Sequence, residues 1–244
     1  MSTWIAFWNI LKKDMKNYYL MPSNVNWGIF FPVSWTLTQF IRSSGNIDVL
    51  EFLPGLMAVS VLFATTSMLS VTITFERKGR SFERLLLAPL SLNALLLAKI
   101  TGTILFGLFI ASVPVLLASF FVSLSGVNWG MAYLSVLLIA LTSTLIGLVI
   151  AVSAKEVFEA QMMSNFFRFP MMFLCGTMMP VQKLPALLRI AAYCLPLTYG
   201  TDILNRSITG ASALPPLACI FALAVFSAIL FGASRYTINN KWIS

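Results

Sequence analysis

Long apolar runs alternate with short polar segments along almost the whole chain. A helix needs about 20 predominantly apolar residues to cross a bilayer, and several runs reach or approach that length. The pattern therefore predicts six membrane-spanning helices. They are expected at 25–41, 54–75, 94–124 and 130–154, then in a run that ends near residue 179, and at 216–236. In the fourth, Gly147 and Ala151 form a small-xxx-small pair, which indicates close helix packing.

The first 21 residues have the pattern of an amphipathic helix, because bulky apolar side chains and polar side chains recur on opposite faces. Such a helix lies in the headgroup region, with aromatic rings at the interface and lysines toward anionic lipid. We therefore expect an interfacial helix over residues 1–21, ended by Pro22. The apolar face comprises Trp4, Phe7, Trp8, Leu11, Met15 and Tyr18, and the polar face Asn9, Lys12, Lys13, Lys16 and Asn17.

The most informative polar segment is 75–91, FERKGRSFERLLLAPLS, between the second and third predicted spans. The chain has 16 Lys and Arg and 8 Asp and Glu, and six of these 24 charged residues lie here. Charges are costly in hydrocarbon, so the segment is expected in water. Ser81 can cap a helix, and Glu83 then falls in its first turn, where the helix dipole favours an acid. Pro89 ends this helix.

The side chains of this short helix divide into two faces. An apolar knob ringed by charges is typical of a surface that docks into a groove on a partner protein. The alternative is a solvated, positively charged loop with no partner. The apolar face comprises Phe82, Leu85 and Leu86, and the charged face Arg80, Glu83 and Arg84.

A second unusual segment is 180–206, before the last predicted span. Its apolar stretch 184–195 has a helical pattern but is too short to cross a membrane. Pro185 and Pro196 lie at its ends. We therefore expect a short re-entrant or lid-like helix on the outside.

Composition supports a membrane protein, since 59% of the residues are hydrophobic, 10% are charged and the mean hydropathy is +0.88. Soluble domains have about 45–50% apolar and about 25% charged residues. The formal charge of +8 does not indicate nucleic-acid binding, because the basic residues are scattered at span ends. Of the 16 Lys and Arg, 12 fall on one side of the predicted topology, which predicts that both termini are cytoplasmic.

The sequence carries no phosphate-binding loop for ATP, no histidine and no cysteine spacing typical of a metal site. The cysteines Cys175, Cys194 and Cys219 are expected in apolar packing. Lys155, Glu156, Glu159 and Arg168 are expected in the second inside loop and at the foot of the fifth span. The predicted spans then carry almost no charge besides Lys99, which we expect to extend to the inner surface. An ion-coupled transporter usually has ionisable groups at membrane depth, so the scarcity of charge argues against ion-coupled transport.

The segment 75–91 resembles the coupling-helix motif of ABC type-2 export permeases of the drug-resistance branch. The family pattern is an acid, a glycine, Thr or Ser, a bulky apolar residue, Glu-Arg-Leu-Leu and Pro-Leu-Ser. A departure is that Gly79 stands one position early, with Arg80 behind it. A second match is Pro-Leu-Thr-Tyr at 196–199, followed by Asp202 and Arg206. The residues that match the first motif are Glu76, Ser81, Phe82, Glu83, Arg84, Leu85, Leu86, Pro89, Leu90 and Ser91.

The resemblance covers the whole chain and implies one transmembrane domain over 1–244. The implied fold class is an all-α integral membrane protein of the plasma or inner membrane. It has six transmembrane helices, an elbow helix (1–21), a cytoplasmic coupling helix in the loop 76–91 and a short extracellular re-entrant helix in 180–206. No enzymatic activity is expected in the chain itself. An ABC ATPase subunit would bind ATP and Mg²⁺, and a second copy of the chain or a related permease would complete the transporter.

The resemblance also implies site residues. An ATPase would dock on Glu76, Arg80, Phe82, Glu83, Arg84, Leu85 and Leu86. A hydrophobic gate between the outer halves of the second and fifth spans, 56–63 and 171–179, would include Leu56, Val59, Phe63, Phe173 and Met178. The outer lid would include Pro185, Pro196 and Tyr199.

The expected function is export of amphipathic or hydrophobic small molecules, as in multidrug efflux. Export of a lipid-linked glycan or polysaccharide by the same architecture is one alternative. A membrane scaffold or assembly factor that transports nothing is another, and it predicts no ATPase partner.

Overall fold

The computed structural model describes residues 3–21, 29–30, 33–35, 37–38, 49–86, 91–177 and 180–242, and these contain helices and no strand. The first predicted span, 25–41, lies mostly outside the described residues, although its described pieces are helical. The elements are α1 Thr3–Asp14, the π-helix η1 Met15–Tyr19, α3 Val49–Lys78, α4 Ser81–Leu86, α5 Leu92–Ser119, α6 Trp129–Ser153, α7 Val157–Leu174, the 3₁₀-helix η2 Val181–Lys183, α8 Ala186–Tyr193, α9 Pro196–Thr209 and α10 Pro216–Trp242.

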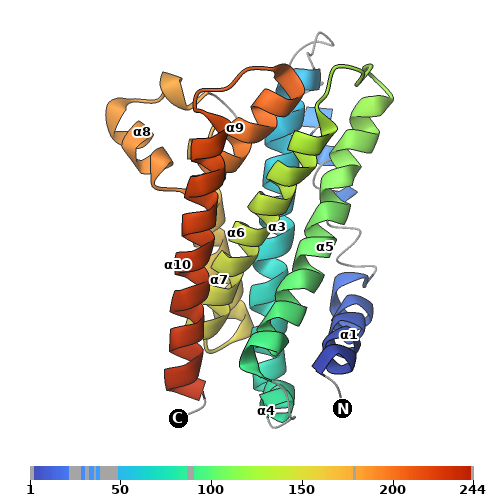
Figure 1. Ribbon diagram of the computed structural model, residues 1–244, viewed down its shortest axis with the longest axis vertical. Helices are drawn as coiled ribbons and strands as arrows, with labels where there is room; N and C mark the ends of the chain where they lie inside the picture. The colour runs from blue at the N-terminus through green and yellow to red at the C-terminus, as the bar shows by residue number, and fades with distance from the viewer. Residues whose placement is uncertain are drawn as a thin grey trace.

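The long helices form a bundle in which α3 is the central element (Figure 1). Helix α3 contacts α5, α6, α7 and α9, so it is enclosed by neighbours along much of its length. Its sequence explains this position, because between residues 52 and 74 it has no charged residue and no polar face. Helix α10 packs on α6 and α9 at the edge and exposes more of its apolar side chains.

Four described helices are long and apolar enough to cross a membrane, namely α3, α5, α6 and α10. They match four of the predicted spans, with ends that differ by a few residues. Helix α7 corresponds to the fifth prediction but carries Glu159 and Arg168 within its 18 residues and is not among these four. The structure therefore supports an all-helical membrane protein, and the count of six spans stays a prediction.

Close packing of α6 on α3 confirms the interpretation of Gly147. A Cβ atom built on Gly147 would lie 2.6 Å from the backbone oxygen of Thr66, well inside van der Waals contact. Only glycine allows the two backbones to approach so closely here.

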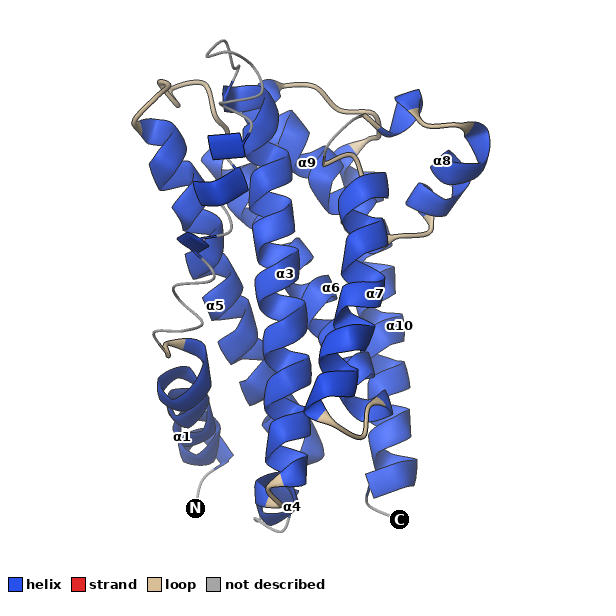
Figure 2. Ribbon diagram, turned by 180° about the vertical axis from the view of Figure 1, so that it is seen from behind, coloured by secondary structure: helices blue, strands red, loops and turns tan. Residues whose placement is uncertain are grey.

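The bundle has two distinct ends. Helix α4, the first turn of α1 and the last turn of α10 lie at one end, which we call the α4 end (Figure 2). Helices α8 and α9 lie at the other, which we call the α8 end. At the α4 end, Arg77 of α3 donates to the carbonyl oxygens of Ala151 (3.3 Å) and Ala154 (3.0 Å), where α6 terminates. A cation at a helix C-terminus is favourable, so this contact joins the ends of α3 and α6.

Candidate functional site

Helix α4 is the short helix that the sequence predicts between the second and third spans. It follows α3 after two turn residues, and Arg80, the second of these, has a φ of +55°. This left-handed conformation is costly for any residue with a Cβ atom. The resembled motif has glycine directly before the Ser or Thr, which is the position that Arg80 takes here. The backbone therefore keeps the turn that the glycine of the motif favours.

Phe82 does not form an exposed knob, which corrects the predicted docking face. Its side chain is 1% exposed and belongs to an apolar cluster with Ile73 of α3, Leu95 of α5 and Ile10 of α1. The reason is that the turn at Arg80 folds α4 back toward the bundle, so its apolar face meets the chain's own core. Phe82 therefore fixes α4 to the bundle and is not available to a partner.

Glu76 is also wrongly assigned to the docking surface. Its carboxylate is fully buried at the end of α3, where Lys13 Nζ lies 2.7 Å from Oε1 and Lys99 Nζ lies 2.6 Å from Oε2. Because α1 covers this position, Glu76 pairs within the chain and does not face water.

Lys99 does not extend to the surface as expected. It is 0% exposed and lies between Glu76 and Asp14, whose Oδ2 is 2.9 Å from Lys99 Nζ. Lys13 completes the group, 3.5 Å from Asp14 Oδ1. Two cations, Lys13 and Lys99, thus balance two carboxylates, Asp14 and Glu76. This four-residue ion-pair cluster joins α1, α3 and α5 at the α4 end.

The surroundings of the cluster are polar and enclosed. Tyr19, the last residue of the π-helix, is fully buried, and Thr103 Oγ1 lies 3.0 Å from its hydroxyl. Burial and the charge of Asp14 raise the pKa of Tyr19. For Lys13, burial by itself lowers the pKa, but the hydrogen bond to Glu76 and the charges of Glu76 and Asp14 outweigh burial, so the pKa is raised. Lys13 is therefore held as a cation by the cluster.

Two predicted docking residues remain open to a partner. Arg80 and Arg84 are exposed, while Leu85 is half-buried against the same apolar cluster as Phe82. Glu83 and Leu86 lie in α4, and their side chains are outside the described part of the structure. Among the described side chains, the exposed ones at α4 and in the turn before it include the basic residues Arg80 and Arg84, and Phe82 is buried.

The predicted gate residues do not share one open surface. Leu56 and Val59 are buried among the neighbours of α3, so neither lines an open path in the single chain, which corrects that prediction. A path between two copies would leave such side chains exposed in one copy. Phe63 is half-buried and Phe173 is exposed, while Met178 lies outside the described residues.

Arg168 is not at the foot of the fifth span, as the sequence suggested, but inside the bundle on α7. It is 3% exposed, and its Nη1 donates to the carbonyl oxygen of Phe63 at 3.2 Å. Phe63 is 14 residues after the first residue of α3 and 15 before the last. Arg168 therefore lies at mid-depth of the longest helix, which corrects its predicted place at the foot of the fifth span.

The predicted lid is divided between two helices. Helix α8 stands away from the long helices and contacts α7 and α9 (Figure 1), with Pro185 as its N-cap. Pro196 instead begins α9, which packs against α6, α3 and α10, so Pro196 is buried and Tyr199 half-buried. The hydroxyl of Tyr199 donates to the carbonyl oxygen of Tyr193 at 2.8 Å and ties α9 to α8. Residues 196–206 therefore belong to the bundle, which corrects their assignment to the lid.

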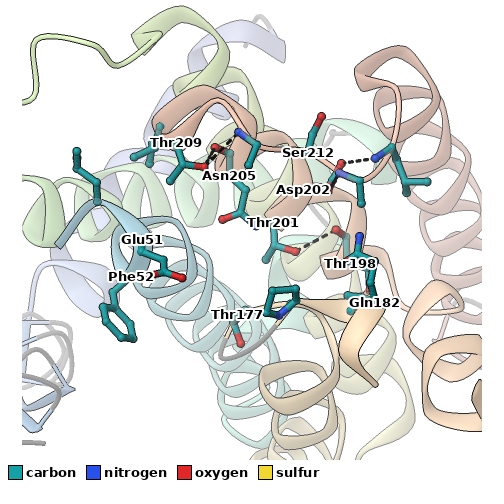
Figure 3. A pocket seen from close by; sticks show the side chains of 18 of the residues that line it. Glu51, Phe52, Thr177, Gln182, Thr198, Thr201, Asp202, Asn205, Thr209 and Ser212 are labelled. Carbon is teal, nitrogen blue, oxygen red and sulfur yellow. Dashed lines mark hydrogen bonds between the residues drawn. The ribbon is translucent and has the colours of Figure 1, made fainter. Parts of the chain in front are cut away.

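A cavity of about 730 Å³ opens at the α8 end, and sequence reasoning did not predict it. Figure 3 shows hydroxyl, amide and carboxylate side chains around this space, with Glu51 from α3 opposite Thr201 and Asn205 from α9. Along α9 the polar lining residues Thr198, Thr201, Asn205 and Thr209 recur at spacings of three and four. That periodicity is visible in the sequence and could have revealed a polar helix face.

The comparisons with known proteins agree with this architecture. A family profile described as ABC-2 type transporter matches residues 5–208. The inner membrane transport permease YadH of Escherichia coli (strain K12) is 22% identical over 231 residues, which cover 91% of this chain and 90% of that protein. The protein of the same name from Shigella flexneri matches with the same figures. The profile covers well over half of the 244 residues, and the chain therefore belongs to the ABC-2 type transporter family.

Proposed function

We propose that the chain is the permease subunit of an ATP-driven exporter that moves amphipathic or hydrophobic molecules out of the cell. Two copies and two separate ATPase subunits form the working transporter, and the ATPases bind ATP and Mg²⁺. The α4 end faces the cytoplasm. The observation that supports this most directly is the short helix α4 at one end of a permease of this family, with exposed Arg84 in the helix and exposed Arg80 in the turn before it.

The contacts of α4 explain how movement of an ATPase would reach the membrane. Phe82 packs α4 into the same apolar cluster as Ile73 of α3 and Leu95 of α5. The ion-pair cluster connects α3 to α1 and α5 a few residues away. A displacement of α4 therefore moves these helices together. Helix α3 has 30 residues and so extends for about 45 Å, from α4 to the cavity at the α8 end.

The apolar face of α7 supports an amphipathic or hydrophobic substrate. Five side chains at spacings of three and four are between 48% and 75% exposed, and they form one stripe along the helix. Phe and Met surfaces can adapt to ligands of varied shape. The stripe comprises Phe158, Met162, Phe166, Phe169 and Phe173.

The test is ATP-dependent uptake of an anionic amphiphilic dye, 8-anilinonaphthalene-1-sulfonate, into inverted membrane vesicles that contain the chain and its co-expressed ATPase. Arg84→Glu reverses an exposed charge on α4 without removing a buried contact. We expect this variant to retain less than a tenth of the co-purifying ATPase and to lose ATP-dependent uptake. Arg189→Glu, a matched charge reversal on exposed α8, should retain the ATPase. Normal ATPase binding and uptake by Arg84→Glu would refute docking on α4.

A second candidate is export of a lipid-linked glycan, and the cavity at the α8 end favours it. Its lining offers the carboxylate of Glu51, the amide of Asn205 and several threonine hydroxyls, which are groups that bind sugar hydroxyls. Deletion of the chain would then remove a surface glycan and leave dye export unchanged. The opposite result would support export of amphipathic small molecules.

A further inference from the structure

With the described residues, Arg168 makes three hydrogen bonds, and all of them go to neutral groups. Its Nε donates to the carbonyl oxygen of Ser164 (3.1 Å), Nη1 to that of Phe63 (3.2 Å) and Nη2 to Asn165 Oδ1 (2.6 Å). The guanidinium carbon lies 4.7 Å from the centre of the Phe63 ring. An arginine side chain has five N–H donors, so two of them have no acceptor among the described residues.

No described carboxylate lies within ion-pair distance of Arg168. The contrast with Lys99 is informative, because that buried cation is balanced by Asp14 and Glu76. A buried charge that is not paired is expensive, and charged residues at mid-membrane are rare and usually mark a substrate or ion path. Within the described part of the chain, the positive charge of Arg168 therefore has no counter-charge.

Polar side chains extend from Arg168 toward the surface along α7. Asn165 and Gln161, which precede it by three and seven residues, are half-exposed, and Ser67 Oγ of α3 donates to Gln161 Oε1 at 3.3 Å. Lipid tails cannot hydrogen-bond to such groups. Asn165 both contacts the guanidinium and reaches the surface, so a rotation of its side chain would give a ligand access to Arg168. This polar strip lies directly beside the exposed Phe and Met stripe of α7.

We propose that Arg168 recognises the anionic group of a transported amphiphile, a carboxylate, phosphate or sulfate. The apolar part of the same molecule lies against the stripe that includes Phe166 and Phe169. The planar guanidinium can form two parallel hydrogen bonds with such an anion, which also supplies the missing negative charge. The proposal rests on the proposed transport function and narrows its substrate class to anionic amphiphiles. The anion is either a free amphiphile or the headgroup of a membrane lipid.

The experiment compares a charged probe with its neutral counterpart. The intact chain is placed in nanodiscs of phosphatidylcholine, and the fluorescence of cis-parinaric acid and of its methyl ester is titrated against empty nanodiscs. We expect the acid to bind at least tenfold more tightly than the ester. Arg168→Gln should lose this preference, and Arg168→Lys should retain part of it. Arg235→Gln, at an exposed position on α10, serves as the matched control and should bind the acid like the unaltered chain.

The melting temperature of each variant identifies loss of folding, and Arg168→Lys keeps the test decisive if Arg168→Gln unfolds. The proposal is overturned if folded Arg168→Gln still prefers the acid, or if the unaltered chain binds acid and ester equally. In that case Arg168 only joins α7 to α3.

Replacement of a tenth of the lipid by phosphatidylglycerol distinguishes the two sources of the anion, a free amphiphile and a lipid headgroup. If phosphatidylglycerol competes with cis-parinaric acid in a way that depends on Arg168, the anion is a lipid headgroup. If it does not compete, the anion is a free amphiphile. The binding experiment contains no ATPase. If it fails, it therefore argues against anion recognition by Arg168 and not against ATP-dependent transport by the chain.

Discussion

Arg80, in the turn before α4, has a left-handed backbone conformation that glycine adopts more easily. Replacing it by glycine should therefore affect the stability of the chain and the binding of a partner in opposite directions. The left-handed region costs a residue with a Cβ atom about 1–2 kcal/mol relative to glycine. Arg80→Gly should therefore raise the free energy of unfolding by about 1 kcal/mol. If the guanidinium group of Arg80 contacts the ATPase, less ATPase should co-purify with Arg80→Gly than with the unaltered chain. Thermal unfolding in detergent and co-purification of the ATPase measure the two effects.

Arg84→Gly is the matched control for this prediction. Arg84 is also exposed but lies within α4, where glycine costs about 1 kcal/mol relative to a good helix former. The two substitutions should thus change stability in opposite directions. If Arg80→Gly destabilises the chain as much as Arg84→Gly does, the left-handed turn is not the source of strain.

Single residues also show where sequence reasoning ends. The sequence reveals that Lys99 lies in an apolar run, but its partners Asp14 and Glu76 are 85 and 23 residues away, and no local pattern connects them. The charged residues at 155–168 predict Arg168 at the foot of the fifth span, whereas α7 begins earlier, at Val157. The apolar spacing of Phe82 identified a buried face correctly but could not tell a partner's groove from the chain's own core.

At the scale of elements, the ion-pair cluster determines how α1 is attached to α3 and α5. Lys99→Met would leave the carboxylates of Asp14 and Glu76 with Lys13 as their remaining cation in the cluster. Breaking a buried ion pair from one side typically costs about 3–5 kcal/mol, so we expect a loss of that order in the free energy of unfolding. Limited proteolysis should also cut the residues after α1 faster.

A surface ion pair of α3, between Lys78 and Glu156, provides the control. Lys78 Nζ lies 3.9 Å from Glu156 Oε1, and the two side chains are 64% and 67% exposed. Lys78→Met should cost less than about 1 kcal/mol. The double variant Lys99→Met with Glu76→Gln should recover part of the loss of Lys99→Met. Equal effects of the Lys78 and Lys99 substitutions would contradict a structural role for the cluster.

The contact of α6 with α3 gives a second prediction at this scale. Gly147→Ala would force a methyl group against the backbone of Thr66 and should destabilise the chain by about 1–3 kcal/mol. Gly232→Ala in α10 is the matched control, because apart from chain neighbours and the adjacent backbone of α10 no described atom lies within 4 Å of the added methyl group there. That substitution should be neutral or stabilising by up to about 1 kcal/mol. Thermal unfolding of the two variants should therefore shift in opposite directions, and a neutral Gly147→Ala would rule out close backbone contact.

The helices themselves were largely predictable, because runs of apolar residues as long as α3, α5, α6 and α10 leave few alternatives. The short helices α1, α4 and α8 were also expected, and the prediction failed at α9. Residues 196–206 have the composition of a loop, but in α9 their apolar side chains, such as Leu197, Ile203 and Leu204, face the bundle. Tertiary packing supplies the apolar environment that the local sequence does not indicate.

For the whole molecule, the distribution of Lys and Arg predicts that the α4 end is cytoplasmic. Gln182 is exposed near the α8 end and Asn239 is exposed near the end of α10. In cells that carry a Cys194→Ala background, a membrane-impermeant maleimide should label Gln182→Cys from outside. It should label Asn239→Cys only after the membrane is opened. Labelling of Asn239→Cys in intact cells would reverse the topology and place α4 outside.

The central claim is that an ATPase binds the chain through α4, and cysteine cross-linking to the co-expressed ATPase tests it most directly. In the Cys194→Ala background, Arg84→Cys on α4 and Gln182→Cys at the opposite end are treated with a short bismaleimide, and cross-linked ATPase is detected by mass. The account predicts a cross-link from Arg84→Cys that ATP binding changes in yield, and none from Gln182→Cys. An ATPase that co-purifies but does not cross-link to Arg84→Cys, or that cross-links to Gln182→Cys, would contradict it.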